Sequence, residues 1–179
     1  MSFTSYTKTK VDDPMELFNA CKEGRVDVVK LLLAMPDIDV NQAADTGETP
    51  LIMACQEGHV DVVRLLLARE EIQINQANES GFTPLFATCW KGHVEVVRLL
   101  LARKEIQINQ ADDNGTTPLY ITCNYGHVEV VRLLLARKEI QINQADKYGR
   151  TPLLIACQMG HVDVVQLLLA KKEIQINQA

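Results

Sequence analysis

The chain has 179 residues, 47% of them hydrophobic and 23% charged, which is enough apolar surface to bury a core and too much for a disordered chain. No apolar run approaches the roughly 18 residues that a membrane-spanning helix needs, and the opening residues lack the apolar segment of a secretory signal peptide. The formal charge of −5 gives the chain no net attraction to phosphate, so we expect neither a nucleic-acid nor a membrane partner.

The cysteines are regularly spaced. They recur every 34 residues, at Cys21, Cys55, Cys89, Cys123 and Cys157. The chain contains no Cys-x-x-Cys motif, and no cysteine lies beside a histidine in a zinc-like pattern. One cysteine per interval is typical of a repeated structural position, so we expect five buried thiols in a reducing, cytoplasmic type of compartment if the protein is natural.

The same interval divides the whole chain. Thr-Pro-Leu begins at Thr49, Thr83, Thr117 and Thr151, and Gly-His begins at Gly58, Gly92, Gly126 and Gly160. Cutting at this period gives a leader, 1–9, and five units, 10–43, 44–77, 78–111, 112–145 and 146–179, the last of which ends with the sequence. Such internal similarity predicts a solenoid, in which each unit buries its apolar face against its neighbours.

Each unit predicts two helices and a turn. In 44–77 a glycine turn over 45–47 comes first, and Thr49 then caps a short helix whose first residue is Pro50. Gly58 ends this helix near residue 57 because glycine tolerates the left-handed conformation. A second helix follows in HVDVVRLLLAR and leads into the extended EIQINQA. Its inner face is expected to carry Val60, Val63, Leu66 and Leu67.

The two end units depart from this pattern. In the first unit Asp12-Asp13-Pro14 takes the place of the turn and Thr-Pro, which again predicts an N-cap followed by proline. The last unit differs in its second helix and the residues after it mainly by Gln166 and Lys171, and it keeps the apolar VDVVQLLLA. We therefore expect the C-terminal unit to fray or to associate end to end with another molecule. Apart from such association, we expect the chain to be a monomer.

The segment TPLIMACQEGHVDVVRLLL strongly resembles the ankyrin repeat, and five copies in register extend the resemblance over about residues 12–179. The resemblance implies an all-α solenoid of stacked helix-turn-helix units, with hairpin-like loops projecting from one edge beside a concave groove. It also implies a non-catalytic protein–protein interaction module. Three features depart from the family pattern: the unit is one residue longer than usual, the second alanine is cysteine, and the histidine after Thr-Pro-Leu is replaced.

The four full units differ among themselves in one half only. From Gly58 to Ala77 and its equivalents, sixteen of twenty positions are identical, whereas from Ala44 to Glu57 only five of fourteen are. If the resemblance holds, the variable positions line the groove. At the loop tips they are Asp45, Thr46, Glu48, Glu79, Ser80, Phe82, Asp113, Asn114, Thr116, Lys147, Tyr148 and Arg150. Along the first helices they are Met53, Gln56, Glu57, Ala87, Trp90, Lys91, Ile121, Asn124, Tyr125, Ile155, Gln158 and Met159.

All six aromatic residues of the four full units lie in the variable halves: Phe82, Phe86, Trp90, Tyr120, Tyr125 and Tyr148. Interfaces are enriched in aromatic residues, which favours partner binding. The alternative is that some of them fill gaps between units, Phe86 and Tyr120 above all. Charge along the groove runs from an acidic end in the second unit to a basic end in the fifth, which is expected to orient a partner.

The sequence offers little other chemistry. The Gly-His histidines are one unit apart, too far to share a metal ion, and we expect them to orient the start of the second helix. Arg64, Arg98 and Arg132 follow acidic residues at i, i+3, which is typical of a solvated face. No phosphate-binding loop, nucleophile elbow or HExxH motif is present, so we expect no enzyme and no cofactor.

Two functions remain. The first is a binding module for another protein, whose identity the sequence does not give. Near-identical constant halves beside variable groove positions favour an engineered or consensus-derived scaffold, and the alternative is a natural array that duplicated in tandem and then diverged. The second is a structural scaffold without a specific ligand, against which the aromatic enrichment argues.

Overall fold

The computed structural model describes residues 15–176 and contains ten helices and no strand within them. The expected leader 1–9 and the Asp12-Asp13-Pro14 cap lie outside the described residues. The helices are α1 (Glu16–Lys22), α2 (Val26–Leu33), α3 (Pro50–Glu57), α4 (Val60–Leu67), α5 (Pro84–Lys91), α6 (Val94–Leu101), α7 (Pro118–Tyr125), α8 (Val128–Leu135), α9 (Pro152–Gln158) and α10 (Val162–Leu169).

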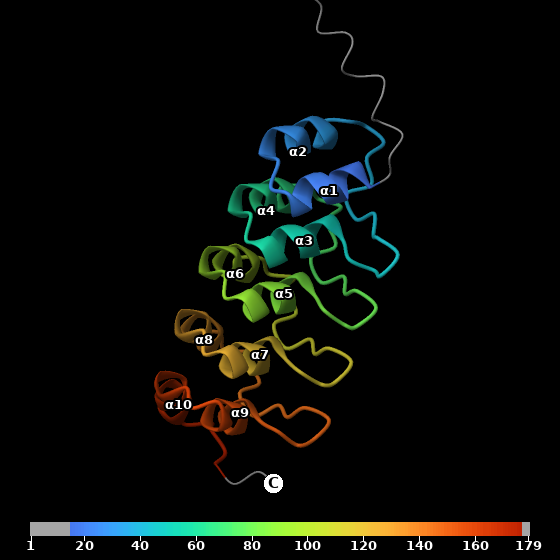
Figure 1. Cartoon of the computed structure of the whole chain (residues 1–179). Coiled ribbons are helices and arrows are strands. Elements are labelled where there is room, and N and C mark those ends of the chain that lie inside the picture. Colours follow the sequence, from blue (N-terminus) through green and yellow to red (C-terminus); the bar gives the residue numbers. More distant parts are fainter. Residues whose placement is uncertain (1–14, 177–179) are drawn as a thin grey trace, which may run out of the picture.

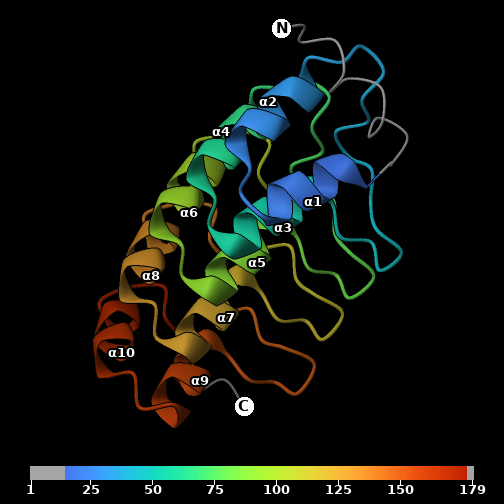
Figure 2. The same ribbon diagram turned by 45° about the horizontal axis from the view of Figure 1, so that its top comes forward.

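The helices form two layers along one stack (Figure 1). The odd-numbered helices pack successively on one another, the even-numbered helices do the same, and each pair within a unit is in contact. The turn loops that precede α3, α5, α7 and α9 all project to the same side, as both views show (Figure 2). The predicted all-α solenoid is confirmed.

The first helix of each full unit begins, and in α3, α5 and α7 also ends, as its residues predict. The Thr49 hydroxyl accepts a hydrogen bond from the Ile52 amide at 3.2 Å, and Pro50 is the first helical residue. Gly58 ends α3 in the left-handed region, with φ of 74°. The same caps are present on α5 and α7, and the threonine cap recurs on α9.

The second helix supplies the inner layer of the core. Val63, Leu66 and Leu67 are buried as predicted, but Val62 is buried as well, whereas Val60 is only half-buried. The reason is the position of Val60 at the start of the helix, on the side that faces the next unit. The equivalent Val162 in the last unit, which has no described unit beyond it, is 63% exposed.

Histidine joins consecutive units. The Nε2–H groups of His59, His93, His127 and His161 donate to backbone carbonyls of the preceding unit at 2.9–3.0 Å. We expected these rings to orient their own helix, but they make no side-chain cap there. Their bonds go to the end of the first helix of the unit before, so each ring links two units.

The connecting segments add two further ladders. Asn75 donates to the Glu105 carbonyl at 2.8 Å and accepts from the Gln107 amide at 2.9 Å, and Asn41, Asn109 and Asn143 do the same one unit apart. Arg103 donates to the Leu67 carbonyl and pairs with Glu105 at 2.9 Å. These bonds join the segments that follow the second helices of successive units. The residues of the constant half therefore serve to hold neighbouring units together.

The last unit leaves apolar side chains uncovered. Leu154, Val162 and Leu169 are 41%, 63% and 47% exposed, although their equivalents in the inner units are buried or half-buried. Cys157 is also exposed, so the expectation of five buried thiols is wrong at this position. The cause is the lack of a further described unit against α9. Within residues 15–176 no helix is long and apolar enough to cross a membrane.

Candidate protein-binding groove

A cavity of about 300 Å³ opens between the first helices and the turn loops of the third, fourth and fifth units. We call it the aromatic pocket, and it is lined by Phe82, Phe86, Trp90, Asp112, Thr116, Tyr120, Ile121, Asn124, Tyr125 and Arg150. Its walls combine aromatic rings with polar groups, and the polar groups other than the rings' own come from two successive turn loops and from α7. Sites of this composition are typical of recognition by burial of an apolar group.

The aromatic side chains of the third unit are packed into a fixed group. The rings of Phe82 and Phe86 stack with centroids 4.6 Å apart, and the Phe82 ring meets Trp90 edge to face at 6.1 Å. Phe86 is buried at 2% exposed, as its gap-filling role predicted, while Phe82 and Trp90 are half-buried. The buried Phe86 ring therefore supports Phe82, which in turn contacts Trp90, and both of these rings reach solvent.

Two exposed tyrosines lie at the pocket or against one of its lining residues: Tyr125 lines it, and Tyr148 contacts the lining residue Arg150. Tyr125 is 49% exposed and its ring stacks on His127 at 6.1 Å. Tyr148 is 74% exposed and lies under the Arg150 guanidinium, 5.0 Å from the ring centroid. Tyr120, in contrast, is only 4% exposed and belongs to the wall of the pocket. Exposed aromatic side chains held by a neighbouring group have little conformational entropy to lose on binding.

Arg150 is held by a buried carboxylate. Its Nε and Nη2 donate to Asp146 Oδ2 at 2.7 and 2.6 Å, and Asp146 Oδ1 accepts from the backbone amides of Tyr148 and Arg150. Burial of Asp146 raises the pKa of that carboxyl, but the hydrogen bonds from Arg150 and the amides outweigh it and leave the pKa below its usual value. The guanidinium is thereby fixed at the mouth of the pocket.

The residues equivalent to Asp146 in the third and fourth units, Asn78 and Asp112, also accept hydrogen bonds from the backbone amides of their turns. Asp112 Oδ1 accepts from the amides of Asn114 and Thr116 at 2.9 and 2.7 Å, and Asn78 holds its own turn in the same way. Asn78 also donates to Glu48 at 3.0 Å, and Thr46 donates to the other carboxylate oxygen of Glu48. Burial raises the pKa of Glu48, but these hydrogen bonds leave it below its ordinary value.

The predicted groove residues fall into three classes. Thirteen are exposed: Asp45, Thr46, Glu57, Glu79, Ser80, Lys91, Asp113, Asn114, Tyr125, Lys147, Tyr148, Gln158 and Met159. Seven are half-buried: Glu48, Gln56, Phe82, Trp90, Ile121, Asn124 and Arg150. Met53, Ala87, Thr116 and Ile155 are buried, because their positions on the helix or turn face the neighbouring unit, and they leave a partner almost no side-chain surface.

Sequence reasoning missed Asp112 as a lining residue and placed Phe86 and Tyr120 outside the groove set, although all three border the aromatic pocket. Asp112 could have been found from its equivalence to Asn78 and Asp146, since a short polar side chain two residues before an exposed turn residue is typical of an Asx turn. The sequence did not indicate that Phe86 and Tyr120 line the pocket, because one edge of each ring packs in the core while the other forms part of the pocket wall.

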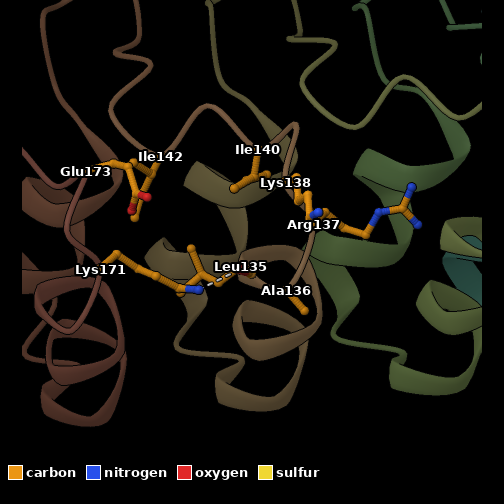
Figure 3. A pocket seen from close by; sticks show the side chains of 8 residues that line it. All are labelled: Leu135, Ala136, Arg137, Lys138, Ile140, Ile142, Lys171 and Glu173. Atoms are coloured by element: carbon orange, nitrogen blue, oxygen red, sulfur yellow. Dashed lines mark hydrogen bonds between the residues drawn. The ribbon is translucent and has the colours of Figure 1, made fainter.

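A second cavity, of about 260 Å³, lies between the connections of the fourth and fifth units (Figure 3). Lys171 stands here where inner units have arginine, and its Nζ donates to the Leu135 carbonyl at 2.7 Å. Figure 3 shows Arg137 extending away from this space. The cavity arises because lysine makes the carbonyl bond of the arginine ladder without filling the space of a guanidinium.

Among the described residues, no group of three or more His, Cys, Asp or Glu side chains could hold a metal ion. Burial raises the pKa of Cys55 and Cys89 to about 12, and it raises that of Cys123 further. These thiols therefore stay protonated and unreactive at neutral pH.

Comparison with known proteins gives one family. None of the curated proteins matches the chain. The family model described as ankyrin repeats (3 copies) matches residues 17–112 and 104–179, which is nearly all of the described structure. The chain, with its helix pairs repeated in register and its loops on one side, therefore belongs to the ankyrin repeat family.

Proposed function

We propose that this chain is a non-catalytic module that binds another protein through the groove formed by its turn loops and first helices. Ankyrin repeats are generally protein–protein interaction modules, and this supports the general class. The groove assigned here is specific to this chain. Its central contacts are Phe82, Trp90 and Tyr125, with Tyr148 and Arg150 beside them.

One observation carries the proposal. The variable half of the units contains a pocket of about 300 Å³ whose aromatic walls come from adjacent units. Anchoring residues at interfaces cluster in this way, with large rings at the centre and polar groups at the rim. The constant half, in contrast, is occupied by the His, Asn and Arg bonds between units. Variation is therefore concentrated where it changes recognition and leaves the stacking intact.

The alternative, a structural scaffold without a ligand, has less support. In a scaffold without a ligand, the half-buried Trp90 and the 74% exposed Tyr148 would not be expected, because exposed aromatic area lowers solubility and adds nothing to the core. The binding proposal holds equally for a designed scaffold and for a natural array that duplicated in tandem. For a natural protein, the five free thiols favour a reducing compartment.

The test is a selection of random 16-residue peptides displayed on phage against the immobilised full chain. We expect enriched peptides whose affinity falls about 10-fold or more for Trp90→Ala. Peptide binding to the unmodified chain can also be followed by intrinsic fluorescence, since Trp90 is the single tryptophan of the sequence. Lys104→Glu, in the exposed connection after α6, is the control and is expected to change nothing. Failure to enrich any peptide that depends on Trp90 would overturn the proposal.

A further inference from the structure

We infer that the partner segment presents basic residues to the turn tips of the second to fourth units, an apolar anchor to the aromatic pocket, and an acidic residue to the tip of the fifth unit. This inference rests on the function proposed above and specifies the chemistry and the direction of the partner.

The first argument is the charge at one repeated position. Asp45, Glu79, Asp113 and Lys147 are equivalent residues, and we call them the tip row. All four are exposed, and among the described residues no hydrogen bond or ion pair of their side chains is found. The row therefore offers three negative charges followed by one positive charge to solvent. A surface of this pattern is complementary to a segment with the opposite order.

The second argument is that the tip row is rigidly spaced. The Glu79 amide donates to the Thr46 carbonyl and the Asp113 amide to the Ser80 carbonyl, both at 3.2 Å, and the Lys147 amide donates to Asn114 at 2.9 Å. Each tip is thus bonded through its backbone to the one before it. With units stacked at about 10 Å, a segment in the polyproline II conformation, which rises about 3.1 Å per residue and turns once every three residues, presents a side chain of one face to each tip in turn.

The third argument concerns which charges are still available. Glu48 is bound by Thr46 and Asn78, and Arg150 is bound by Asp146, so these groups shape the groove and have less to offer a partner. The tip row has no such internal partners in the described residues. The sign change between Asp113 and Lys147 is therefore the feature that distinguishes one direction of the partner from the other.

The fourth argument places the anchor. The aromatic pocket is lined by residues of the third, fourth and fifth units, the units whose tips are Glu79, Asp113 and Lys147. A segment whose anchor enters this pocket therefore has its basic side over the earlier tips and its acidic side over Lys147. Reversing the segment would set like charges against one another along the row, which is unfavourable.

The peptides enriched on the full chain provide the test. We expect them to share an aromatic or large aliphatic residue, with Lys or Arg at three-residue intervals on one side and Asp or Glu on the other. Lys147→Glu is expected to weaken such peptides about 5-fold or more at low ionic strength, and Glu79→Lys to do the same, while Lys104→Glu, an equal charge change outside the groove, leaves affinity unchanged. Both losses should shrink at 0.5 M salt.

The outcomes separate the two proposals. Peptides that depend on Trp90 but show no charge order, or bind Lys147→Glu as tightly as the unmodified chain, would overturn this inference and leave the groove as the binding surface. Absence of any Trp90-dependent peptide would overturn both. Melting temperatures of the Lys147→Glu, Glu79→Lys and Lys104→Glu variants, expected to match that of the unmodified chain within about 2 °C because the mutated side chains are exposed, exclude misfolding as the cause.

Discussion

The imidazole ring of His93 packs directly on Gly58 of the preceding unit, while its Nε2–H donates to the Gln56 carbonyl at 2.9 Å. A Cβ atom on Gly58 would come within 2.7 Å of two atoms of that ring. The glycine is therefore required twice, for its left-handed φ of 74° and for the space above it. This pairing explains why Gly and His recur together, although the partners in contact belong to different units.

The last unit contains a natural control for this relationship. Gly160 has the same φ of 74°, but nothing lies within 4 Å of a Cβ placed on it. We expect Gly160→Ala to cost about 1–2 kcal/mol of unfolding free energy from backbone strain alone, and Gly58→Ala to cost about 1–3 kcal/mol more because the ring must move. Urea unfolding of the two variants measures the difference. Equal losses would show that the His93 contact has no energetic weight.

The pKa of Asp146 predicts an acid-dependent contribution to stability. Because this pKa is lowered in the folded chain, the ion pair with Arg150 stabilises fully above the unfolded value of about 3.9 and is lost as the pH falls through the folded value. We expect Asp146→Asn to cost about 1–2 kcal/mol at pH 7 and progressively less as the pH falls below about 3.9, since the amide keeps the turn as Asn78 does. Unfolding free energies measured at several pH values provide the test.

The control for this experiment is Asp113→Asn, which removes an exposed carboxylate one unit earlier. Its effect should be small, because the carboxylate is exposed. A loss for Asp146→Asn that persists unchanged at pH 2 would mean that the substitution disturbs the turn and not the ion pair.

Thiol reactivity should divide the cysteines by position. Cys157 is exposed and is expected to react with a thiol reagent within seconds to minutes under native conditions. Cys55 and Cys89 should react only through unfolding, because they are buried and their pKa is raised to about 12. Mass spectrometry of peptides after timed labelling distinguishes the sites. Labelling of all five at one rate would contradict the burial described here.

The fifth unit is expected to open first, because one side of it is uncovered. Helices α10 and α6 have nearly the same sequence, VDVVQLLL and VEVVRLLL, so their amides differ little in intrinsic exchange rate. Leu169 is 47% exposed whereas Leu101 is 7% exposed. We expect native-state hydrogen exchange to be at least about 10-fold faster in α10 than in α6. Equal protection in the two helices would contradict this expectation.

Much of the fold was predictable because local signals repeat. Thr49, Pro50 and Gly58 predict the start and end of α3 by their own chemistry, and the 34-residue period predicts the stack. The bonds between units were not predictable in this way. His93 reaches a carbonyl 37 residues earlier, and Asn75 reaches one 30 residues later. A pattern within one unit cannot indicate which carbonyl in the next unit lies at hydrogen-bonding distance.

The sequence predicted which loops and helices form the candidate site, but it predicted less well which of their side chains are exposed. Variation among the units indicated Trp90 and Tyr125, which reach solvent, but it also indicated Met53 and Ala87, which do not. Helices α3, α5 and α7 are only eight residues long, and each contacts the first helices of the units before and after it, so a variable residue there is as able to fill a gap between units as to face a partner.

The groove is proposed to be a binding surface that is independent of the core. This is tested most directly by comparing Trp90→Ala with Leu66→Ala. The measurement is melting temperature and affinity for a peptide selected on the chain. Trp90 is half-buried at the pocket and Leu66 is fully buried. We predict that Trp90→Ala loses about 2 kcal/mol of binding free energy with little change in melting temperature, and that Leu66→Ala loses about 2–5 kcal/mol of stability while the folded fraction still binds normally. If Trp90→Ala lowers the stability as much as Leu66→Ala does, Trp90 belongs to the core and the groove is wrongly assigned.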